Sequence, residues 1–189
     1  MNDAVKIYKN AAGEKLAIYY DRTPENPREW ANMGEFIVPD RCSYAKNESD
    51  IALEYGSYGG DAAALEKHPD VAAFLPVYVY DHSGVAMNTT GFSCPWDSGQ
   101  IGWMIITRKK VQEFTNWKRI NARRREKLED YIRGEIETYS AYINGDVYGY
   151  VVYAAGDDDE IIDGCWGYYG DAGIDQIKED HPEFTEEIA

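Results

Sequence analysis

The chain has 189 residues, a length that allows one sizeable hydrophobic core or two smaller ones. Hydrophobic residues make up 44% of it and aromatic residues 14%, a composition that excludes an intrinsically disordered chain. The formal net charge of −15 argues against direct binding to nucleic acid or to an anionic membrane, because both select basic surfaces.

Apolar periodicity and turn residues predict strands and helices without regular β-α-β alternation. The predicted strands are residues 4–8, 15–20, 33–38, 76–81, 85–88, 100–107, 146–155 and 160–169. The predicted helices are 61–67, 108–114, 117–144 and 172–179, with a further helical turn at 70–74. The order predicts a single α+β domain over residues 1–189, with a mostly antiparallel sheet, one long amphipathic helix and shorter helices.

Local signals place several boundaries of these elements. Asp61 and Thr107 are expected N-caps of the helices that follow them. Gly84 is expected to take a positive φ in the tight turn that joins two predicted strands. The tail 181–189 is expected to fray.

Charge is unevenly distributed along the chain. Residues 1–107 carry 15 acids and 8 bases, residues 108–127 carry nine bases and two acids, and residues 128–189 carry 17 acids and two bases. A basic band, residues 108–127, therefore lies between two acidic regions. Three consecutive arginines, residues 123–125, point in different directions around a helix and do not make one flat patch.

The C-terminal third carries closely spaced carboxylates interleaved with tyrosines. The candidate binding residues are Asp146, Asp157, Asp158, Asp159, Glu160, Asp163, Asp171 and Asp175. Duplex DNA presents one charge per ~1.7 Å of its axis, so closely spaced acids can occupy a cationic nucleic-acid groove on another protein. The plain alternative is that the acids serve only solubility.

No metal or cofactor site is predicted. The acidic run 157–160 lacks the spaced ligand pattern of a calcium loop and has the character of a solvated turn. No phosphate-binding glycine loop, nucleophile elbow or zinc-binding spacing is present.

Two turns bring together a candidate thiol site. Cys94, His82 and Asp97 are the thiol, imidazole and carboxylate that a cysteine nucleophile needs. The turns lie side by side if strands 76–81 and 100–107 are neighbours. The structural alternative is that Cys94 is an inert core residue. Because Cys94 precedes Pro95, no helix N-terminus begins directly at it to activate its thiol.

Two aromatic segments have structural and functional interpretations. In CPWDSGQ, Asp97 can close an Asx-turn while Trp96 fills the core, or the segment can be a recognition loop. In CWGYYG, residues 165–170, glycines alternate with aromatics as they do where rings cover a neighbouring backbone. A base-stacking platform is the functional alternative, which the surrounding negative charge opposes.

The compartment is expected to be a reducing cytoplasm. Cys42, Cys94 and Cys165 form an odd set without metal-type spacing, which argues against a disulfide framework. The first ten residues lack the apolar core of a signal peptide. No apolar run reaches the ~18–20 residues that cross a bilayer.

The segments PREWANMG, YDHSG, GFSCPWDSGQIGW and CWGYYG resemble a family of uncharacterised small proteins from phages, plasmids and conjugative elements of Gram-positive and gut bacteria. The likeness spans about Tyr19 to Gly170, and CPWDSGQ is its most specific part. The resemblance carries no catalytic residues with it. It implies a gene that travels with mobile DNA and a protein that acts in the host bacterial cytoplasm.

The leading hypothesis is therefore an acidic anti-defence protein, such as an inhibitor of a CRISPR or restriction complex. Its expected partner is a host defence protein that binds nucleic acid, and its expected mechanism is protein binding with nucleic-acid mimicry. One alternative is a cysteine-dependent hydrolase or modifying enzyme that uses Cys94, His82 and Asp97. Another is a virion or plasmid-maintenance component that makes only protein contacts.

Overall fold

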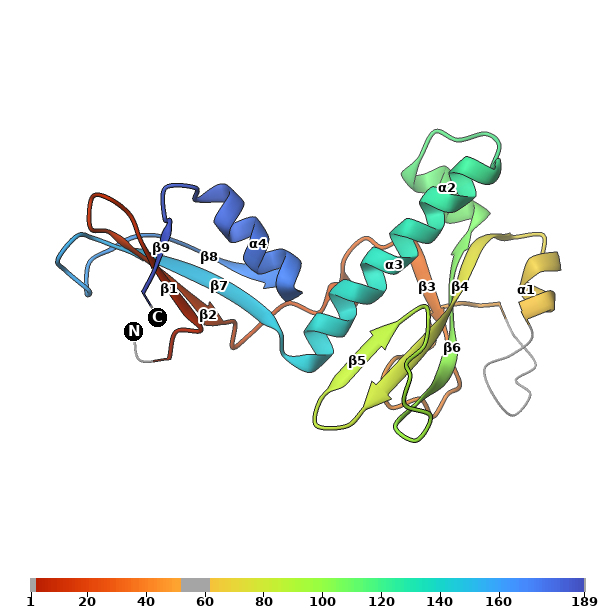
Figure 1. The fold of residues 1–189 in the computed structure, drawn as a ribbon. Helices are drawn as coiled ribbons and strands as arrows, with labels where there is room; N and C mark the ends of the chain where they lie inside the picture. The colour runs from red at the N-terminus through yellow and green to blue at the C-terminus, as the bar shows by residue number, and fades with distance from the viewer. Residues whose placement is uncertain (1–2, 52–61, 189) are drawn as a thin grey trace. The chain divides into compact units, whose positions relative to one another are not determined.

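The computed structural model describes residues 3–51 and 62–188. The mixed α+β class with antiparallel sheets is confirmed. The chain divides into two compact units: unit 1 comprises Met1–Asn26 with Asn144–Ala189, and unit 2 comprises Pro27–Ile143 (Figure 1). Each unit has its own sheet and its own hydrophobic core, and a single domain over residues 1–189 stays a prediction.

Unit 1 is a five-stranded antiparallel sheet in the order β8-β7-β2-β1-β9. Helix α4 packs on β7 and β8 and covers one face of this sheet (Figure 1). The core between them contains Leu16, Ile18, Val152 and Ile177. The elements are β1 (Lys6–Lys9), β2 (Lys15–Tyr20), β7 (Val147–Tyr153), β8 (Ile161–Tyr169), α4 (Gly170–Asp180) and β9 (Glu186–Glu187).

The tail of the chain corrects one expectation. Residues 181–189 were expected to fray, but β9 pairs with β1, and the Ile188 N–H donates to the Ile7 carbonyl oxygen at 2.9 Å. Two glutamates have little strand propensity, so this pairing depends on the free edge of β1 and not on a local signal.

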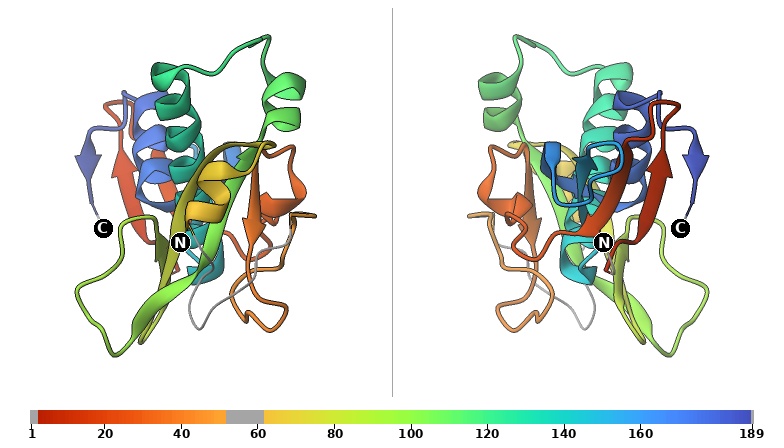
Figure 2. Two further views of the ribbon diagram at one scale, coloured as in Figure 1. Left: turned by 90° about the vertical axis from the view of Figure 1, so that its right-hand side faces the viewer. Right: turned by 90° about the vertical axis from the view of Figure 1, so that its left-hand side faces the viewer.

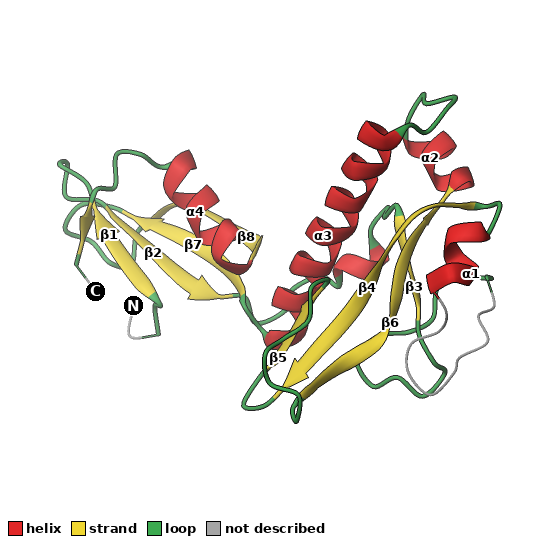
Figure 3. Cartoon of the chain, turned by 45° about the vertical axis from the view of Figure 1, so that its right-hand side comes forward, coloured by secondary structure: helices red, strands yellow, loops and turns green. Residues whose placement is uncertain are grey.

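Unit 2 is a four-stranded antiparallel sheet in the order β3-β6-β4-β5. Helix α3 packs on one face through Leu128, Ile132 and Ile136, and α1 packs on the other face through Leu65 (Figures 2 and 3). The elements are the 3-10 turn η1 (Pro27–Glu29), β3 (Gly34–Ile37), α1 (Ala62–Lys67), β4 (Val71–Asp81), β5 (Val85–Asn88), β6 (Ser98–Thr107), α2 (Arg108–Phe114) and α3 (Ala122–Asn144).

Strand β4 also corrects an expectation. Residues 70–74 were expected to form a helical turn, but β4 begins at Val71 and pairs with β6 along nearly its whole length. The reason is tertiary: β6 pairs with β4 from Ser98 to Thr107 and is buried from Gly102 to Ile106, and this pairing outweighs the weak helical signal.

N-cap side chains determine where helices α2 and α3 begin. Thr107 accepts from the Lys110 N–H at 3.3 Å, which confirms it as an N-cap. Helix α3 begins at Ala122, later than the predicted Trp117, because the Asn121 side chain accepts from the Arg124 N–H at 3.0 Å. The expected N-cap Asp61 lies outside the described residues.

Candidate functional site

The turn that precedes β6 holds Cys94 and Asp97 together. The Cys94 thiol donates to Oδ2 of Asp97 at 3.3 Å, and the Ser98 hydroxyl donates to the Cys94 carbonyl oxygen. The Asp97 carboxylate is therefore engaged by the thiol. Activation of a cysteine requires a neighbouring imidazole or cation, whereas the observed partner is a carboxylate, which brings no positive charge to the thiol.

His82 lies in the adjacent turn. The Asp81 N–H donates to the Asp97 carbonyl oxygen at 2.9 Å, so the two turns lie side by side, as expected from the pairing of β4 with β6. The Nδ1 atom of His82 contacts the Ser83 hydroxyl at 2.9 Å. Among the described residues, no hydrogen bond joins His82 to Cys94, and the three-residue thiol site stays a prediction.

Two details of these turns differ from expectation. Ser83, and not Gly84, has the positive φ of 60° in the β4–β5 turn. Trp96 does not fill the core, because its side chain is 91% exposed. The hydrogen bond between Cys94 and Asp97 closes a turn within which Trp96 is exposed, and this exposure favours the recognition-loop interpretation of CPWDSGQ.

The acidic candidates all lie in unit 1, at several places. Asp157, Asp158, Asp159 and Glu160 form the exposed turn between β7 and β8, which we call the acidic turn. Asp163 lies within β8, and Asp171 and Asp175 lie on α4. Asp146 precedes β7, so it lies at the opposite end of that strand from the acidic turn.

Several of these carboxylates have partners. Asp158 forms an ion pair with Lys15 at 2.8 Å, and Asp175 forms one with Lys178 at 3.2 Å. Asp163 accepts from the Tyr150 hydroxyl at 3.0 Å and from the Gly164 N–H at 2.8 Å. Burial, and then the hydrogen bond to Asp163, raises the pKa of Tyr150.

At the other end of β7, the charges of Asp146 and Asp171 both affect the pKa of Tyr148. Burial, followed by the negative charge of Asp146 and more weakly that of Asp171, raises the pKa of Tyr148 to about 12. Unit 1 therefore has acidic groups at both ends of its central strands.

Unit 1 also carries an aromatic cluster that the sequence only partly indicated. Trp166 lies over Gly149, as the alternation in CWGYYG predicted, and its ring centroid is 6.5 Å from that of Tyr19. The hydroxyl groups of Tyr19 and Tyr153 are 3.0 Å apart. Trp166 remains 49% exposed, which is more than a core residue allows.

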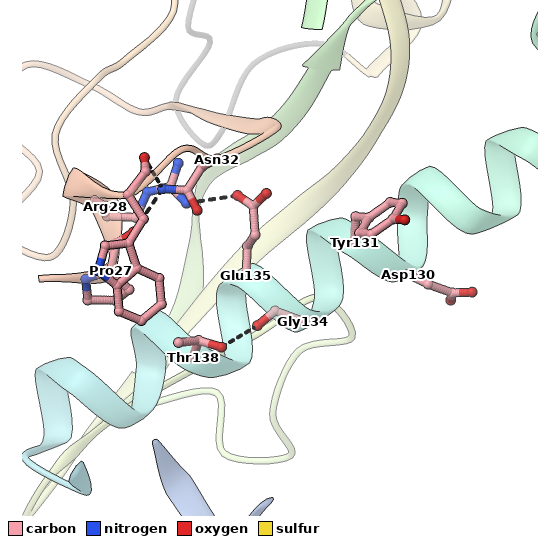
Figure 4. Close-up of a pocket in the computed structure, with 9 residues that line it drawn as sticks. Pro27, Arg28, Asn32, Asp130, Tyr131, Gly134, Glu135 and Thr138 are labelled. Atoms are coloured by element: carbon pink, nitrogen blue, oxygen red, sulfur yellow. Dashed lines mark hydrogen bonds and ion pairs between the residues drawn. The ribbon is translucent and has the colours of Figure 1, made fainter. Parts of the chain in front are cut away.

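Unit 2 contains an ion-pair cluster that sequence reasoning missed. Arg28 bonds Glu48 at 2.7 Å and Glu135 at 2.9 Å, and its side chain is only 9% exposed. Glu135 reaches from α3 toward Arg28 (Figure 4). It also accepts from the N–H groups of Met33 and Gly34. No local pattern joins residues 28, 48 and 135, so only the fold reveals the cluster.

The cluster lies beside a shallow cavity of about 280 Å³. Tyr131, Gly134 and Thr138 of α3 line it together with Trp30 and Asn32 (Figure 4). Burial lowers the pKa of Arg28, but the hydrogen bonds that its guanidinium donates to Glu48 and Glu135, and the charges of these carboxylates, outweigh burial and raise the pKa overall. The carboxylates here already have partners, so the cluster holds η1, β3 and α3 together.

The basic band of residues 108–127 lies in unit 2 and is partly neutralised. Arg124 lies 5.1 Å from the centre of the Trp117 ring, and Arg125 pairs with Glu66 at 3.4 Å. Arg123 is exposed. The three consecutive arginines thus point in different directions, as predicted.

No known protein family, curated protein or solved structure matches the chain. Across residues 3–51 and 62–188, no group of acidic, cysteine or histidine side chains has the geometry of a metal site. No helix in the same ranges combines the length and apolar character needed to cross a membrane.

Proposed function

We propose that this protein binds another protein through unit 1, and that the partner is a nucleic-acid-binding effector of a bacterial defence system. The observation that carries the proposal is the segregation of charge between the two units. Unit 1 has 17 acidic and 5 basic residues, a net charge of −12. Unit 2 has 17 acidic and 14 basic residues, a net charge of −3.

Such a charge difference has a physical consequence for binding. A concentrated negative potential accelerates association with cationic surfaces and makes the affinity depend on salt. A solubilising charge needs no such segregation, because it serves equally well when it is spread over the whole surface. Proteins that grip nucleic acid present dense positive charge, which makes them the natural complement of unit 1.

The acidic turn is suited to this role because its backbone is well ordered by hydrogen bonds. The Ala154 N–H donates to the Glu160 carbonyl oxygen at 2.9 Å, and the Asp159 N–H donates to Oδ1 of Asp157 at 2.9 Å. The carboxylates are thus held close together before a partner arrives. Preorganisation reduces the conformational entropy lost on binding.

A second acidic region adds length to the surface. Asp146 and Asp171 lie at the end of β7 remote from the acidic turn. Seven residues of strand separate the two ends by roughly 23 Å. Charges spread over this length can follow the track that a nucleic-acid backbone takes through a cationic groove.

The resemblance to proteins of phages, plasmids and conjugative elements supports a host defence complex, of the CRISPR or restriction type, as the partner. The enzyme alternative is weaker, since the Cys94 thiol donates to the Asp97 carboxylate while His82 contacts Ser83.

The test starts with capture of partners from a bacterial lysate on the immobilised full chain. Each captured effector is then titrated with the chain at about 50 and 200 mM salt, where charge-driven binding weakens by tenfold or more. The test variant is Asp157→Asn, Asp158→Asn, Asp159→Asn and Glu160→Gln combined. We expect it to lose affinity and to flatten the salt response.

The control variant removes the same number of charges from unit 2. It combines Glu29→Gln, Asp40→Asn, Glu126→Gln and Glu137→Gln, all at exposed positions. It should bind like the wild type. If the test variant and the wild type bind with equal affinity and unchanged salt dependence, the acidic turn has no role in binding. If the capture yields no nucleic-acid-binding partner, the proposed target is wrong.

A further inference from the structure

The two faces of the unit 1 sheet are unequal. Side chains alternate between faces along a strand, and those of Leu16, Ile18 and Val152 point toward α4. Tyr19 and Tyr153 lie at intervening positions and point to the face opposite α4. Among the described residues of unit 1, no helix covers this second face (Figure 1).

The second face carries an apolar cluster, which we call the Tyr19 face: Tyr19, Tyr153, Ile161 and Trp166. Tyr19 contacts both the Tyr153 hydroxyl and the Trp166 ring. Ile161 pairs directly opposite Tyr153 and is 62% exposed. Trp166 is 49% exposed, and Tyr19 and Tyr153 are partly buried. Apolar side chains that remain accessible and gather on one face are typical of an interaction surface.

Carboxylates border the Tyr19 face at the acidic turn, where Asp158 pairs with Lys15 of the same face. Strand β7 enters the acidic turn just beyond Tyr153, and β8 leaves it at Ile161. Burial and the hydrogen bond with Tyr153 raise the pKa of Tyr19, and the negative charges of Asp3 and Asp158 raise it further. These carboxylates are therefore close enough to act on the aromatic cluster. An apolar centre with an acidic rim complements a cationic surface that also has apolar or planar parts.

The neighbouring edge of the sheet is less suited to binding. Strand β8 is the edge strand, but its pairing with β7 is interrupted at two register shifts. The Asp163 carboxylate also occupies the Gly164 N–H. Bulges and charged groups of this kind prevent another strand from adding to an edge. Docking on the face of the sheet is therefore the available mode.

We propose that the Tyr19 face is the docking surface of unit 1 and that its occupant is an arginine-rich surface of a protein partner. This inference rests on the proposed function and specifies its chemistry. The guanidinium group is planar, weakly hydrated and able to stack on Trp166 or Tyr19 while it bonds a carboxylate of the rim. A lysine ammonium satisfies the carboxylate but stacks less well, so the Tyr19 face should distinguish arginine from lysine.

The experiment uses two fluorescein-labelled probes, nona-arginine and nona-lysine, which have the same charge. Fluorescence anisotropy measures the affinity of each for the full chain. We expect the wild type to bind nona-arginine about fivefold more tightly than nona-lysine, as expected for added stacking contacts. Ile161→Ser and Trp166→Leu should each reduce that preference toward equality, while far-UV circular dichroism shows that the variants remain folded.

Phe114→Leu is the matched control, since Phe114 on α2 of unit 2 is 44% exposed, close to the value for Trp166. It should keep the arginine preference. Equal affinity of the wild type for the two peptides would overturn the inference, as would a preference that survives both Ile161→Ser and Trp166→Leu. Tight binding of a single-stranded oligothymidylate that is lost in Trp166→Leu would also overturn it, because the face would then bind nucleic-acid bases.

The outcomes separate this inference from the proposed function. Salt-sensitive binding of both peptides without a preference rejects the Tyr19 face and leaves the acidic turn as the binding element. Failure to bind either peptide at low salt contradicts both. The neutralised acidic-turn variant should lose affinity for both peptides, whereas the Tyr19-face variants should lose chiefly the difference between them.

Discussion

The indole of Trp166 lies directly over Gly149 across the β7–β8 pair. A β-carbon on Gly149 would be 2.2 Å from Cε3 of Trp166, far inside van der Waals contact. Trp166 therefore takes its place on the sheet because residue 149 has no side chain. The exposed aromatic surface of unit 1 depends on this glycine.

Gly149→Ala should consequently destabilise unit 1. The methyl group must displace the indole, an overpacking change that costs about 1–3 kcal/mol of unfolding free energy. Urea unfolding monitored by tryptophan fluorescence measures the loss, and near-UV circular dichroism reports the displaced ring. Gly134→Ala is the control: no atom lies within 4 Å of its added β-carbon, and α3 should gain about 0.5–1 kcal/mol. Equal effects of the two substitutions would contradict the close contact.

Arg28→Ala should be strongly destabilising to unit 2. It leaves the carboxylates of Glu48 and Glu135 without the cation that they share, a loss of about 3–5 kcal/mol for a buried pair. Arg133→Ala is the comparison, because Arg133 pairs with Glu129 and Asp130 on the exposed surface of α3, where such pairs contribute less than about 1 kcal/mol. Denaturant unfolding of both variants tests the difference, and losses of similar size would show that the cluster is not structural.

Unit 1 should lose stability at alkaline pH. Burial and the charge of Asp146 raise the pKa of Tyr148 to about 12, above its ordinary value near 10. A group whose folded-state pKa is raised contributes its full stabilisation below the unfolded pKa and loses it as pH rises toward the folded one. The loss between pH ~10 and ~12 is on the order of 2–3 kcal/mol. Tyr148→Phe should lose less over that window, and an identical decline in urea unfolding would contradict this origin.

The thiols should differ in reactivity. Cys165 is exposed, whereas Cys94 is partly buried and donates to Asp97. Alkylation by iodoacetamide near neutral pH, followed by mass spectrometry, should therefore label Cys165 before Cys94, and Asp97→Asn should accelerate labelling of Cys94. A Cys94 that reacts fastest in the wild type would instead favour the cysteine-dependent enzyme.

Features that depend on neighbouring residues were predictable. The β1–β2 hairpin follows from two apolar runs around the turn at Gly13, and the Thr107 cap follows from its position before α2. The long helix α3 is amphipathic, as predicted, and buries Leu128, Ile132 and Ile136. In each case the signal and the structure it specifies lie within a few residues of each other.

Features that depend on distant partners were not predictable. Val71 begins a strand because β6 pairs with it, and β9 forms because β1 has an open edge. The Arg28 cluster joins residues separated by more than a hundred positions along the chain. Of the two interpretations of CPWDSGQ, the one that placed Trp96 in the core is wrong, since Trp96 is exposed in the turn that Asp97 and Cys94 close.

The sequence by itself determined the α+β class, the main strands and helices, and the excess of acids in the last third, because local periodicity and composition specify these directly. Only the tertiary structure decided that the 17 acids of unit 1 are accompanied by only five bases, and that Tyr19, Tyr153 and Trp166 meet on the face of its sheet opposite α4. Pairing of β2 with β7 brings these residues together from positions more than a hundred residues apart. No pattern among neighbouring residues specifies which distant strands pair.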